Sequence, residues 1–238
     1  MKENIKQQLL EKVKQYLEYI RDRIQQTVAE KESQTGRLKK DNRHLSPGDM
    51  IAQYAIVAHQ QEHLENLKQL YPSPYFAKCE FETENEKKIM YFGKFSFSEE
   101  GVYSWVTPAA ALRFENPGSA SYTRPDGSKR SGTMQSKDQY MIVDGKLLFY
   151  STESIGNPRE LVYQEHFTQH KQGFVLPEVV EQMEKAQDQI VRAHYHGPFV
   201  ISGPAGSGKT TLALHRVAYL AQSPETAEFF RPEMVLVL

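Results

Sequence analysis

The sequence predicts a multidomain protein that combines α+β and α/β parts, and three observations carry this prediction. Apolar residues recur every three or four positions near the N-terminus, and they alternate with polar residues from Pro72 onward. A glycine-rich phosphate-binding motif begins at Gly203, in a chain whose last residue is Leu238. We therefore expect a helical hairpin arm over 1–71, a small, mostly antiparallel β-rich domain over 72–176, and the truncated N-terminal part of a nucleotide-binding α/β domain over 177–238.

The composition is typical of a soluble globular protein. Hydrophobic residues make up 39% and charged residues 25% of the 238 residues, and the net charge of −1 provides no global basic field for nucleic acid. The single cysteine, Cys79, excludes an internal disulfide and a cysteine-based zinc site, and its alternating context predicts a small buried side chain. No apolar signal region follows the N-terminus and no stretch is long enough to cross a membrane, so we expect a cytoplasmic protein.

Residues 3 to about 42 are predicted to form one long helix that buries a narrow seam against one partner. A breaker follows at Leu45–Asp49, where Ser46 can cap a second helix that has Pro47 at its first position and ends near Leu70. Joined by a short turn, the two helices are expected to pair as an antiparallel coiled coil. The apolar positions of the first helix are Ile5, Leu9, Val13, Leu17, Ile20, Ile24 and Val28.

The tip of this hairpin is basic. Two interpretations stay open: the tip touches a nucleic acid or an acidic protein surface, or it is a solvated helix end where cations favour the helix dipole. The basic residues are Arg37, Lys39, Lys40 and Arg43.

Strand-like alternation begins after the hairpin, at 75–82 and again at 91–98. Asp144-Gly145 lies between two apolar runs and predicts a β-hairpin turn. Residues 156–176 are polar and fit neither pattern. The many aromatic residues can form the core of this domain or a platform on which bases stack. Further strands are expected around Trp105, at Leu112–Phe114, at Ser121–Tyr122, at Tyr140–Val143 and at Leu147–Tyr150.

The phosphate-binding motif G-x-x-x-x-G-K-[ST] comes with the expected flanking elements. An apolar run at 198–202 predicts a buried strand before it, and helical spacing over 210–221 predicts a helix after it. Glycines let consecutive backbone N–H groups curl around an anion, and the helix directs its positive N-terminal end at the phosphates. The motif residues are Gly203, Pro204, Ala205, Gly206, Ser207, Gly208, Lys209 and Thr210, followed by Thr211.

In such a loop the lysine reaches the β- and γ-phosphates of a nucleotide and the hydroxyl residue binds Mg²⁺. Lys209 and Thr210 are therefore the candidate catalytic residues, and Thr210 is the candidate magnesium ligand. A helix is expected before the loop, from Pro177 to about Tyr195. The histidines in this region, among them His194 and His196, have no carboxylate or cysteine partner at a metal-ligand spacing.

The stretch Glu184–Leu220 resembles the front of a UvrD-type superfamily 1 helicase motor. In that family a glutamine lies shortly before the phosphate loop and reads the adenine base, and Gln187 stands at that place. More of the chain is similar to the HelD-type ATPases that recycle bacterial RNA polymerase. The matching segments are Pro74-Tyr75-Phe76-Ala77-Lys78, Tyr91-Phe92-Gly93-Lys94, Ser104-Trp105-Val106-Thr107-Pro108 and Leu214-His215-Arg216-Val217-Ala218-Tyr219-Leu220.

The resemblance implies a RecA-like P-loop α/β domain that binds ATP and Mg²⁺, with RNA polymerase or DNA as the target of the complete motor. Ser104 and Val106 stand where the HelD branch has Asp and Arg. The hairpin tip is basic in this sequence, whereas the branch has acidic residues there, so the role of those acidic residues is not implied for this chain. The Walker B acid and the arginine finger of the family are absent from the sequence. We therefore expect this chain alone to hydrolyse ATP negligibly.

Three alternatives stay open at this point. The motor can be a DNA helicase that acts without polymerase. The hairpin and the β-domain can form a non-catalytic binding module beside an incomplete P-loop domain. The chain can also belong to another P-loop class, such as GTPases or small-molecule kinases, which lack the preceding glutamine.

Overall fold

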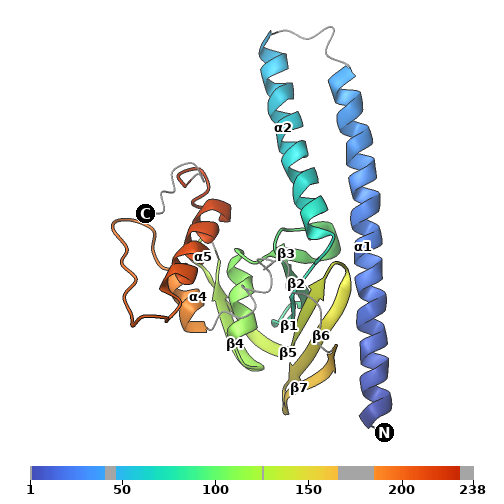
Figure 1. Ribbon diagram of the computed structural model, residues 1–238, viewed down its shortest axis with the longest axis vertical. Coiled ribbons are helices and arrows are strands. Elements are labelled where there is room, and N and C mark those ends of the chain that lie inside the picture. The colour runs from blue at the N-terminus through green and yellow to red at the C-terminus, as the bar shows by residue number, and fades with distance from the viewer. Residues whose placement is uncertain (1, 41–46, 125, 166–184, 231–238) are drawn as a thin grey trace.

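The computed structural model describes residues 2–40, 47–124, 126–165 and 185–230 (Figure 1). Two long helices, α1 (Lys2–Lys40) and α2 (Pro47–Leu70), run side by side in opposite directions and extend beyond a mixed β-sheet. Both helices form within a few residues of the predicted limits. No helix in the described ranges is long and apolar enough to pass through a membrane.

The two helices make their closest apolar contacts near the sheet. Ile24 of α1 and Leu67 of α2 are fully buried there. Lys68 forms an ion pair with Glu32 at 2.8 Å, which joins the two helices just above that core. Farther along α2, the side chains of Ile51, Tyr54 and Ile56 are 72%, 60% and 53% exposed. Burial continues farther along the pair at Thr35 and Val57, which are 6% and 8% exposed, so the helices are in contact above the base as well, and a regular coiled-coil seam stays a prediction. The predicted basic tip lies outside the side chains that the structure describes.

The sheet has the strand order β3-β2-β1-β5-β6-β7, and β4 pairs with β5. The pair β2–β3 is parallel and the other pairs are antiparallel, so the sheet is mixed and the chain is of α+β class. The strands are β1 (Ala77–Glu82), β2 (Lys87–Gly93), β3 (Val102–Ser104), β4 (Gly118–Thr123), β5 (Lys129–Val143), β6 (Lys146–Ser154) and β7 (Asn157–Gln164).

The predicted hairpin turn at Asp144-Gly145 is confirmed. It joins β5 to β6, and both residues have a positive φ, 49° for Asp144 and 75° for Gly145. Two consecutive positive φ angles match the right-handed twist of the flanking strands. The turn also touches the hairpin arm, because the guanidinium of Arg21 on α1 lies directly against Gly145.

Two sequence expectations need correction, and one strand was not predicted. Leu112–Phe114 belongs to a 3₁₀-helix, η3 (Pro108–Phe114), which Pro108 opens because it has no N–H to donate to a strand ladder. The predicted strand at 91–98 ends at Gly93, where a Cβ would clash with the Pro74 carbonyl oxygen, and the chain then turns. Strand β7 was not predicted, because it is an edge strand that is exposed from Asn157 to Leu161 and shows no apolar alternation.

The aromatic residues of the β-domain pack two cores, one on each side of the sheet. The hairpin-side core joins α1 and α2 to the sheet through buried residues that include Tyr75, Phe97 and Tyr140. The η3-side core contains Phe76, Phe92 and Trp105, and it continues onto a helix near the C-terminus, α5 (Lys209–Gln222). These side chains are therefore core residues and are not available as a base-stacking platform. Cys79 is also fully buried, as expected, and burial raises the pKa of its thiol to about 12.

A carboxylate beside the sheet anchors the hairpin arm. Glu100 lies in the short 3₁₀-helix η2 (Ser98–Glu100), and it accepts hydrogen bonds from Arg23 Nε at 2.6 Å and from Tyr19 Oη at 2.8 Å. Burial by itself would raise the pKa of Glu100, but the hydrogen bonds from Arg23 and Tyr19 outweigh it and lower the pKa below the ordinary value of 4.5. A carboxylate with a lowered pKa stabilises the fold above its unfolded-state pKa and loses that effect as the pH falls through its folded-state pKa.

We therefore expect the Glu100 contact to weaken below about pH 4.5. Urea unfolding of the wild type and of Glu100→Gln between pH 7 and pH 3 measures this as a difference in unfolding free energy that shrinks with acidification. The exposed neighbour Glu99 provides the control, because Glu99→Gln should follow the wild-type profile. A Glu100→Gln difference that stays constant over this range would contradict the expectation.

Candidate nucleotide-binding site

The predicted phosphate loop lies at the start of α5. Gly206 and Gly208 have φ angles of 77° and 78°, a left-handed conformation that favours glycine. Gly208 is the residue that caps α5, and its carbonyl accepts the first helical hydrogen bond, from Leu212 N at 2.9 Å. The loop therefore turns sharply into a helix whose first backbone N–H groups have no partner inside the helix. This is the local geometry in which a helix N-terminus binds an anion.

Lys209 folds back over the loop. Its Nζ donates a hydrogen bond to the carbonyl oxygen of Pro204 at 2.7 Å, so the ammonium lies over the loop that it follows in sequence. The other candidate residues, Gly203 to Gly208 together with Thr210 and Thr211, are exposed. The structure thus brings the residues of the motif together around one open surface next to a cation and a helix N-terminus.

The expected strand before the loop is wrong. Residues 198–202 have no strand conformation, and Val200 and Phe199 are 85% and 44% exposed. In the described part of the chain, no strand lies beside this segment. An extended segment without neighbours has no ladder hydrogen bonds and no apolar face to bury against, so the apolar residues stay at the surface.

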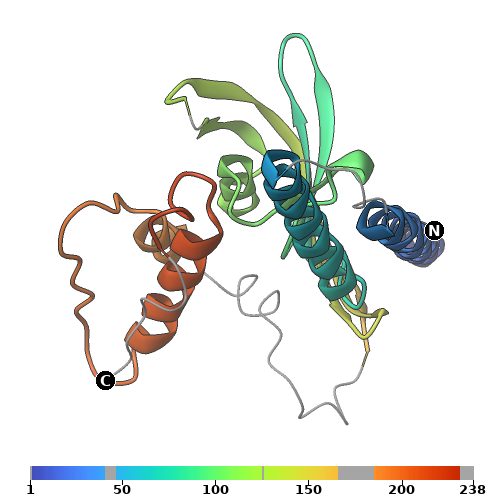
Figure 2. The same ribbon diagram turned by 90° about the horizontal axis from the view of Figure 1, so that it is seen from above.

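The candidate adenine reader lies on a neighbouring helix. Gln187 is half-buried in α4 (Lys185–Val191), and α4 packs against α5 on the side of the sheet away from α1 (Figure 2). The helix predicted from Pro177 to about Tyr195 ends at Val191, and its part up to Glu184 lies outside the described residues. The structure places Gln187 and the loop on adjacent helices, and a direct role of Gln187 stays a prediction.

An arginine that the sequence analysis did not select joins these two helices. Arg216 of α5 is only 6% exposed, and its Nη1 donates to the carbonyl oxygens of Ile190, Val191 and Ala193 at 3.0, 3.1 and 3.0 Å. Its Nη2 donates to the carbonyl oxygen of His194 at 3.0 Å. The guanidinium also lies 3.9 Å from the centre of the Phe199 ring, in the segment that leads to the loop. In the sequence, Arg216 stood only within the matching segment Leu214–Leu220, as a charged residue in an amphipathic helix with no assigned role.

A second arginine attaches α4 to the β-domain. Arg192 Nη2 donates to the carbonyl oxygen of Trp105 at 2.6 Å, and its Nη1 donates to those of Val106 and Thr107 at 3.1 and 3.2 Å. The same guanidinium is paired with the buried carboxylate of Asp188, with Arg192 Nε 2.9 Å from Oδ2. A single side chain therefore links the helix that carries Gln187 to the segment between β3 and η3.

Trp105 forms the matching contact with α5. Its ring is fully buried, its Nε1 donates a hydrogen bond to Gln222 Oε1 at 3.1 Å, and it packs edge-on against Tyr219. Together with Arg192, this places the phosphate-loop helix and α4 on the η3-side core. The segment Ser104–Pro108, which the sequence analysis singled out, thus supports the candidate site without reaching the loop itself.

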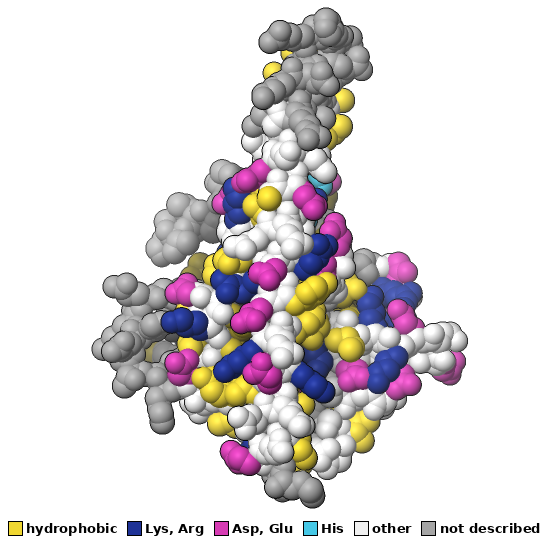
Figure 3. Space-filling view, turned by 90° about the vertical axis from the view of Figure 1, so that its right-hand side faces the viewer, with side chains coloured by type: hydrophobic (Ala, Val, Ile, Leu, Met, Phe, Trp, Pro, Cys, Tyr) yellow, Lys and Arg dark blue, Asp and Glu magenta, His cyan; other side chains and the backbone are white. Residues whose placement is uncertain are grey.

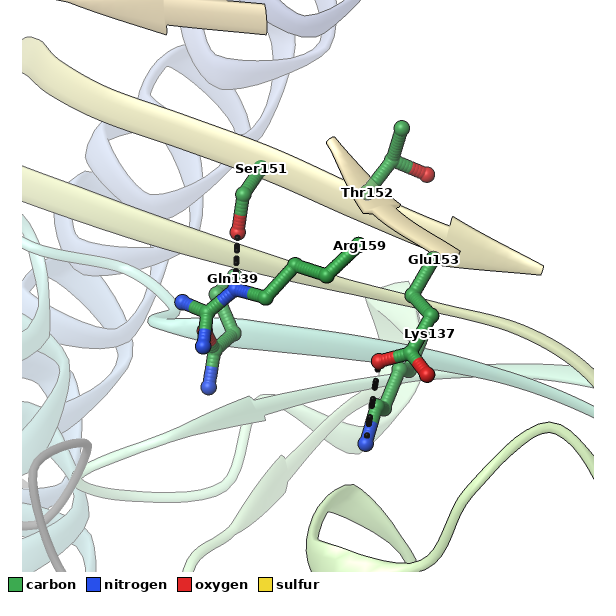
Figure 4. A pocket seen from close by; sticks show the side chains of 6 residues that line it. All are labelled: Lys137, Gln139, Ser151, Thr152, Glu153 and Arg159. Carbon is green, nitrogen blue, oxygen red and sulfur yellow. Dashed lines mark hydrogen bonds and ion pairs between the residues drawn. The ribbon is translucent and has the colours of Figure 1, made fainter. Parts of the chain in front are cut away.

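A small polar pocket also lies on the sheet. It lies among β5, β6 and β7 and has a volume of about 40 Å³. Several of its side chains form hydrogen bonds or ion pairs with one another (Figure 4). Lys137 pairs with Glu153 at 3.3 Å and Arg159 Nε donates to Ser151 Oγ at 3.2 Å. This volume suits a water molecule or two rather than a nucleotide, since ligand sites usually span several hundred Å³.

Neither a charged surface nor a cluster of metal ligands offers a second candidate site among the described residues. On the face that carries α1, basic and acidic side chains are interspersed, and no broad patch of one sign stands out (Figure 3). Across the residues that the structure describes, no group of three or more His, Cys, Asp or Glu side chains could hold a metal ion. The loop before α5 therefore remains the candidate site with the clearest ligand chemistry.

A comparison with known families gives a match over the first two thirds of the chain. A family model described as the N-terminal domain of the DNA helicase IV HelD matches residues 6–167. No curated protein matches the sequence. The matched region contains nearly all of α1, all of α2 and every strand of the sheet, and it ends before α4 and the phosphate loop.

Proposed function

The chain belongs to the HelD N-terminal domain family of helicases, and from this premise we propose that it is the front part of an ATP-dependent superfamily 1 motor of the HelD type. ATP binds at the loop before α5, and the motor to which the chain contributes acts on RNA polymerase. The observation that carries the nucleotide part is the loop geometry, with left-handed Gly206 and Gly208 leading into α5 and the Lys209 ammonium over the loop.

In this proposal the backbone N–H groups of Gly206 to Lys209 hold the phosphates of ATP. Lys209 leaves the Pro204 carbonyl and turns its ammonium to the β- and γ-phosphates, where it offsets their negative charge. Thr210, exposed in the first turn of α5, offers its hydroxyl as one ligand to Mg²⁺. The metal ion neutralises phosphate charge when it is bound. Gln187 recognises the adenine base from α4.

Binding of Mg-ATP by the 238-residue chain tests this proposal directly. Lys209→Ala is expected to weaken binding about 10- to 100-fold, because it removes a charged hydrogen-bond donor to the phosphates. Isothermal titration calorimetry measures the dissociation constant. Lys12→Ala, which removes an exposed lysine of α1, is the matched control and should bind like the wild type. No binding by the wild type, or equal binding by Lys209→Ala, would refute the nucleotide site.

The polymerase part of the proposal rests on the family and on the shape of the arm. Helices α1 and α2 extend well past the sheet (Figure 1) and expose Ile51, Tyr54 and Ile56 along α2. Co-purification of the chain with bacterial RNA polymerase tests this part. Retention on DNA without polymerase would instead favour a DNA helicase, the runner-up within the same class.

A non-catalytic binding module is the second candidate function, and one observation favours it. The family match covers the arm and the sheet but not the phosphate loop. Thermal unfolding separates the two candidates, because a ligand that binds only the folded chain must raise its melting temperature. An unchanged melting temperature in excess Mg-ATP would favour the binding module.

A further inference from the structure

Arg216 closes the C-terminal end of α4 from outside that helix. The last carbonyl groups of a helix have no partner inside it, and a cation at this end also interacts favourably with the helix dipole. The four carbonyls that accept from Arg216 belong to Ile190, Val191, Ala193 and His194, at and just after the end of α4. These contacts therefore fix where the C-terminal end of α4 lies against α5.

The same side chain is rigidly connected to the phosphate loop. Arg216 lies seven residues after Lys209 on α5, which puts both on one face of the helix about 10 Å apart along its axis. Gln187 lies one helical turn before Val191, whose carbonyl Arg216 holds. The Arg216 guanidinium therefore joins α5, which begins at Lys209, to α4, which carries Gln187. Its contact with the Phe199 ring adds the segment that enters the loop.

We infer that Arg216 is a positioning residue that sets the separation between Gln187 and the phosphate loop, and that it thereby makes the site selective for adenine nucleotides. This inference rests on the proposed function. Arg216 touches no phosphate or base in this scheme and acts only by fixing α4 against α5. A planar guanidinium can serve four carbonyls at once in a fixed geometry, which an ammonium cannot do.

Three ligands distinguish recognition of the base from binding of the phosphates. They are Mg-ATP, Mg-GTP and magnesium tripolyphosphate, each titrated into the 238-residue chain. The wild type is expected to prefer ATP over GTP about tenfold, the effect of one hydrogen-bonded recognition contact. Arg216→Met should lower ATP affinity to the level of GTP and leave tripolyphosphate affinity unchanged. Gln187→Ala should show the same loss, and the double variant should lose nothing more.

Two further variants control the experiment. Arg216→Lys keeps the charge but not the planar fork, so it should lose the preference for ATP as well, and it serves if Arg216→Met does not fold. Arg130→Met removes an arginine that pairs with Glu86 at 2.6 Å, remote from α4 and α5, and it should keep the preference. Circular dichroism verifies the fold of each variant.

The outcomes are distinct. If the wild type binds neither ATP nor tripolyphosphate, the proposed nucleotide site is wrong and the role of Arg216 falls with it. If the wild type prefers ATP and both Arg216 variants keep that preference, only the inference about Arg216 is overturned. It is also overturned if Arg216→Met weakens tripolyphosphate as much as ATP, because Arg216 would then support the loop in general.

Discussion

Replacing Trp105 with alanine is expected to lower the free energy of unfolding by about 3–5 kcal/mol, the usual range when a fully buried aromatic side chain is removed from a core. The ring is completely buried in the η3-side core and packs edge-on against Tyr219 of α5. Its loss would leave a cavity between the β-domain and α5 and would leave Gln222 without its indole donor. Urea unfolding followed by far-UV circular dichroism measures the change, since Trp105 is the one tryptophan of the chain and its fluorescence is lost in the variant.

Trp105→Phe is the matched control. It keeps an aromatic ring against Tyr219 and removes the hydrogen bond to Gln222, so its cost should be much smaller than that of alanine. If Trp105→Ala cost no more than Trp105→Phe, the ring would not be a packing element between the β-domain and α5. The attachment of the phosphate-loop helix would then depend mainly on Arg192.

Replacing Lys78 with methionine should cost about 3 kcal/mol, because it leaves a carboxylate buried without its cation. Asp138 is 3% exposed, and its Oδ2 lies 2.6 Å from Lys78 Nζ. Two hydroxyl groups also donate to it, Tyr140 Oη at 2.9 Å and Thr152 Oγ1 at 2.6 Å, but neither supplies a positive charge. Chemical unfolding at neutral pH measures the change in free energy.

Two variants test the explanation. Lys87→Met removes a lysine of β2 that pairs with Glu80 of β1, but the side chains of this pair are 57% and 22% exposed and screened by water, so its effect should be much smaller. Asp138→Asn removes the buried charge itself, and Lys78 can then turn to solvent. Its cost should lie below that of Lys78→Met. Equal effects for Lys78→Met and Lys87→Met would show that the buried charge is not the cause.

The elements that could be predicted are those whose signal is local. The apolar stripe of α1, the capping residues before α2 and the spacing of α5 each lie within one continuous segment, and all three helices form. The Asp144-Gly145 turn is also local, since both residues tolerate the positive φ angles that the hairpin needs.

The errors arise where residues outside the segment itself decide the outcome. Leu112-Arg113-Phe114 alternates apolar and charged residues as a strand does, yet Leu112 is buried within η3, because Pro108 starts a 3₁₀-helix. The run at 198–202 reads as a buried strand by composition, but a strand needs a neighbour, and none lies beside it in the described ranges. Periodicity cannot supply that information because it does not report what lies next to a segment.

In the candidate site, too, the residues with a local sequence signal could be predicted and those that depend on distant partners could not. The motif alone located the loop residues from Gly203 to Thr211, because glycine, lysine and threonine at fixed spacing carry the chemistry of phosphate binding. Sequence reasoning missed Arg216 and Arg192, since both act on backbone carbonyls, which any residue can offer. A pattern of side-chain types contains no trace of such partners. The position of Gln187 in the site stays a prediction that the binding experiments decide.

The anchoring of α1 has a mechanical consequence. The contacts of Arg23 and Tyr19 with Glu100 hold α1 at the level of the sheet, and from Arg23 to Lys40 the helix continues for roughly 25 Å at 1.5 Å per residue. A rod of this length acts as a lever with its pivot at the sheet, and a tilt of about 10° at the pivot moves its far end by about 4 Å. The far end of the arm therefore magnifies angular changes that are too small to disturb the hydrogen bonds at its base.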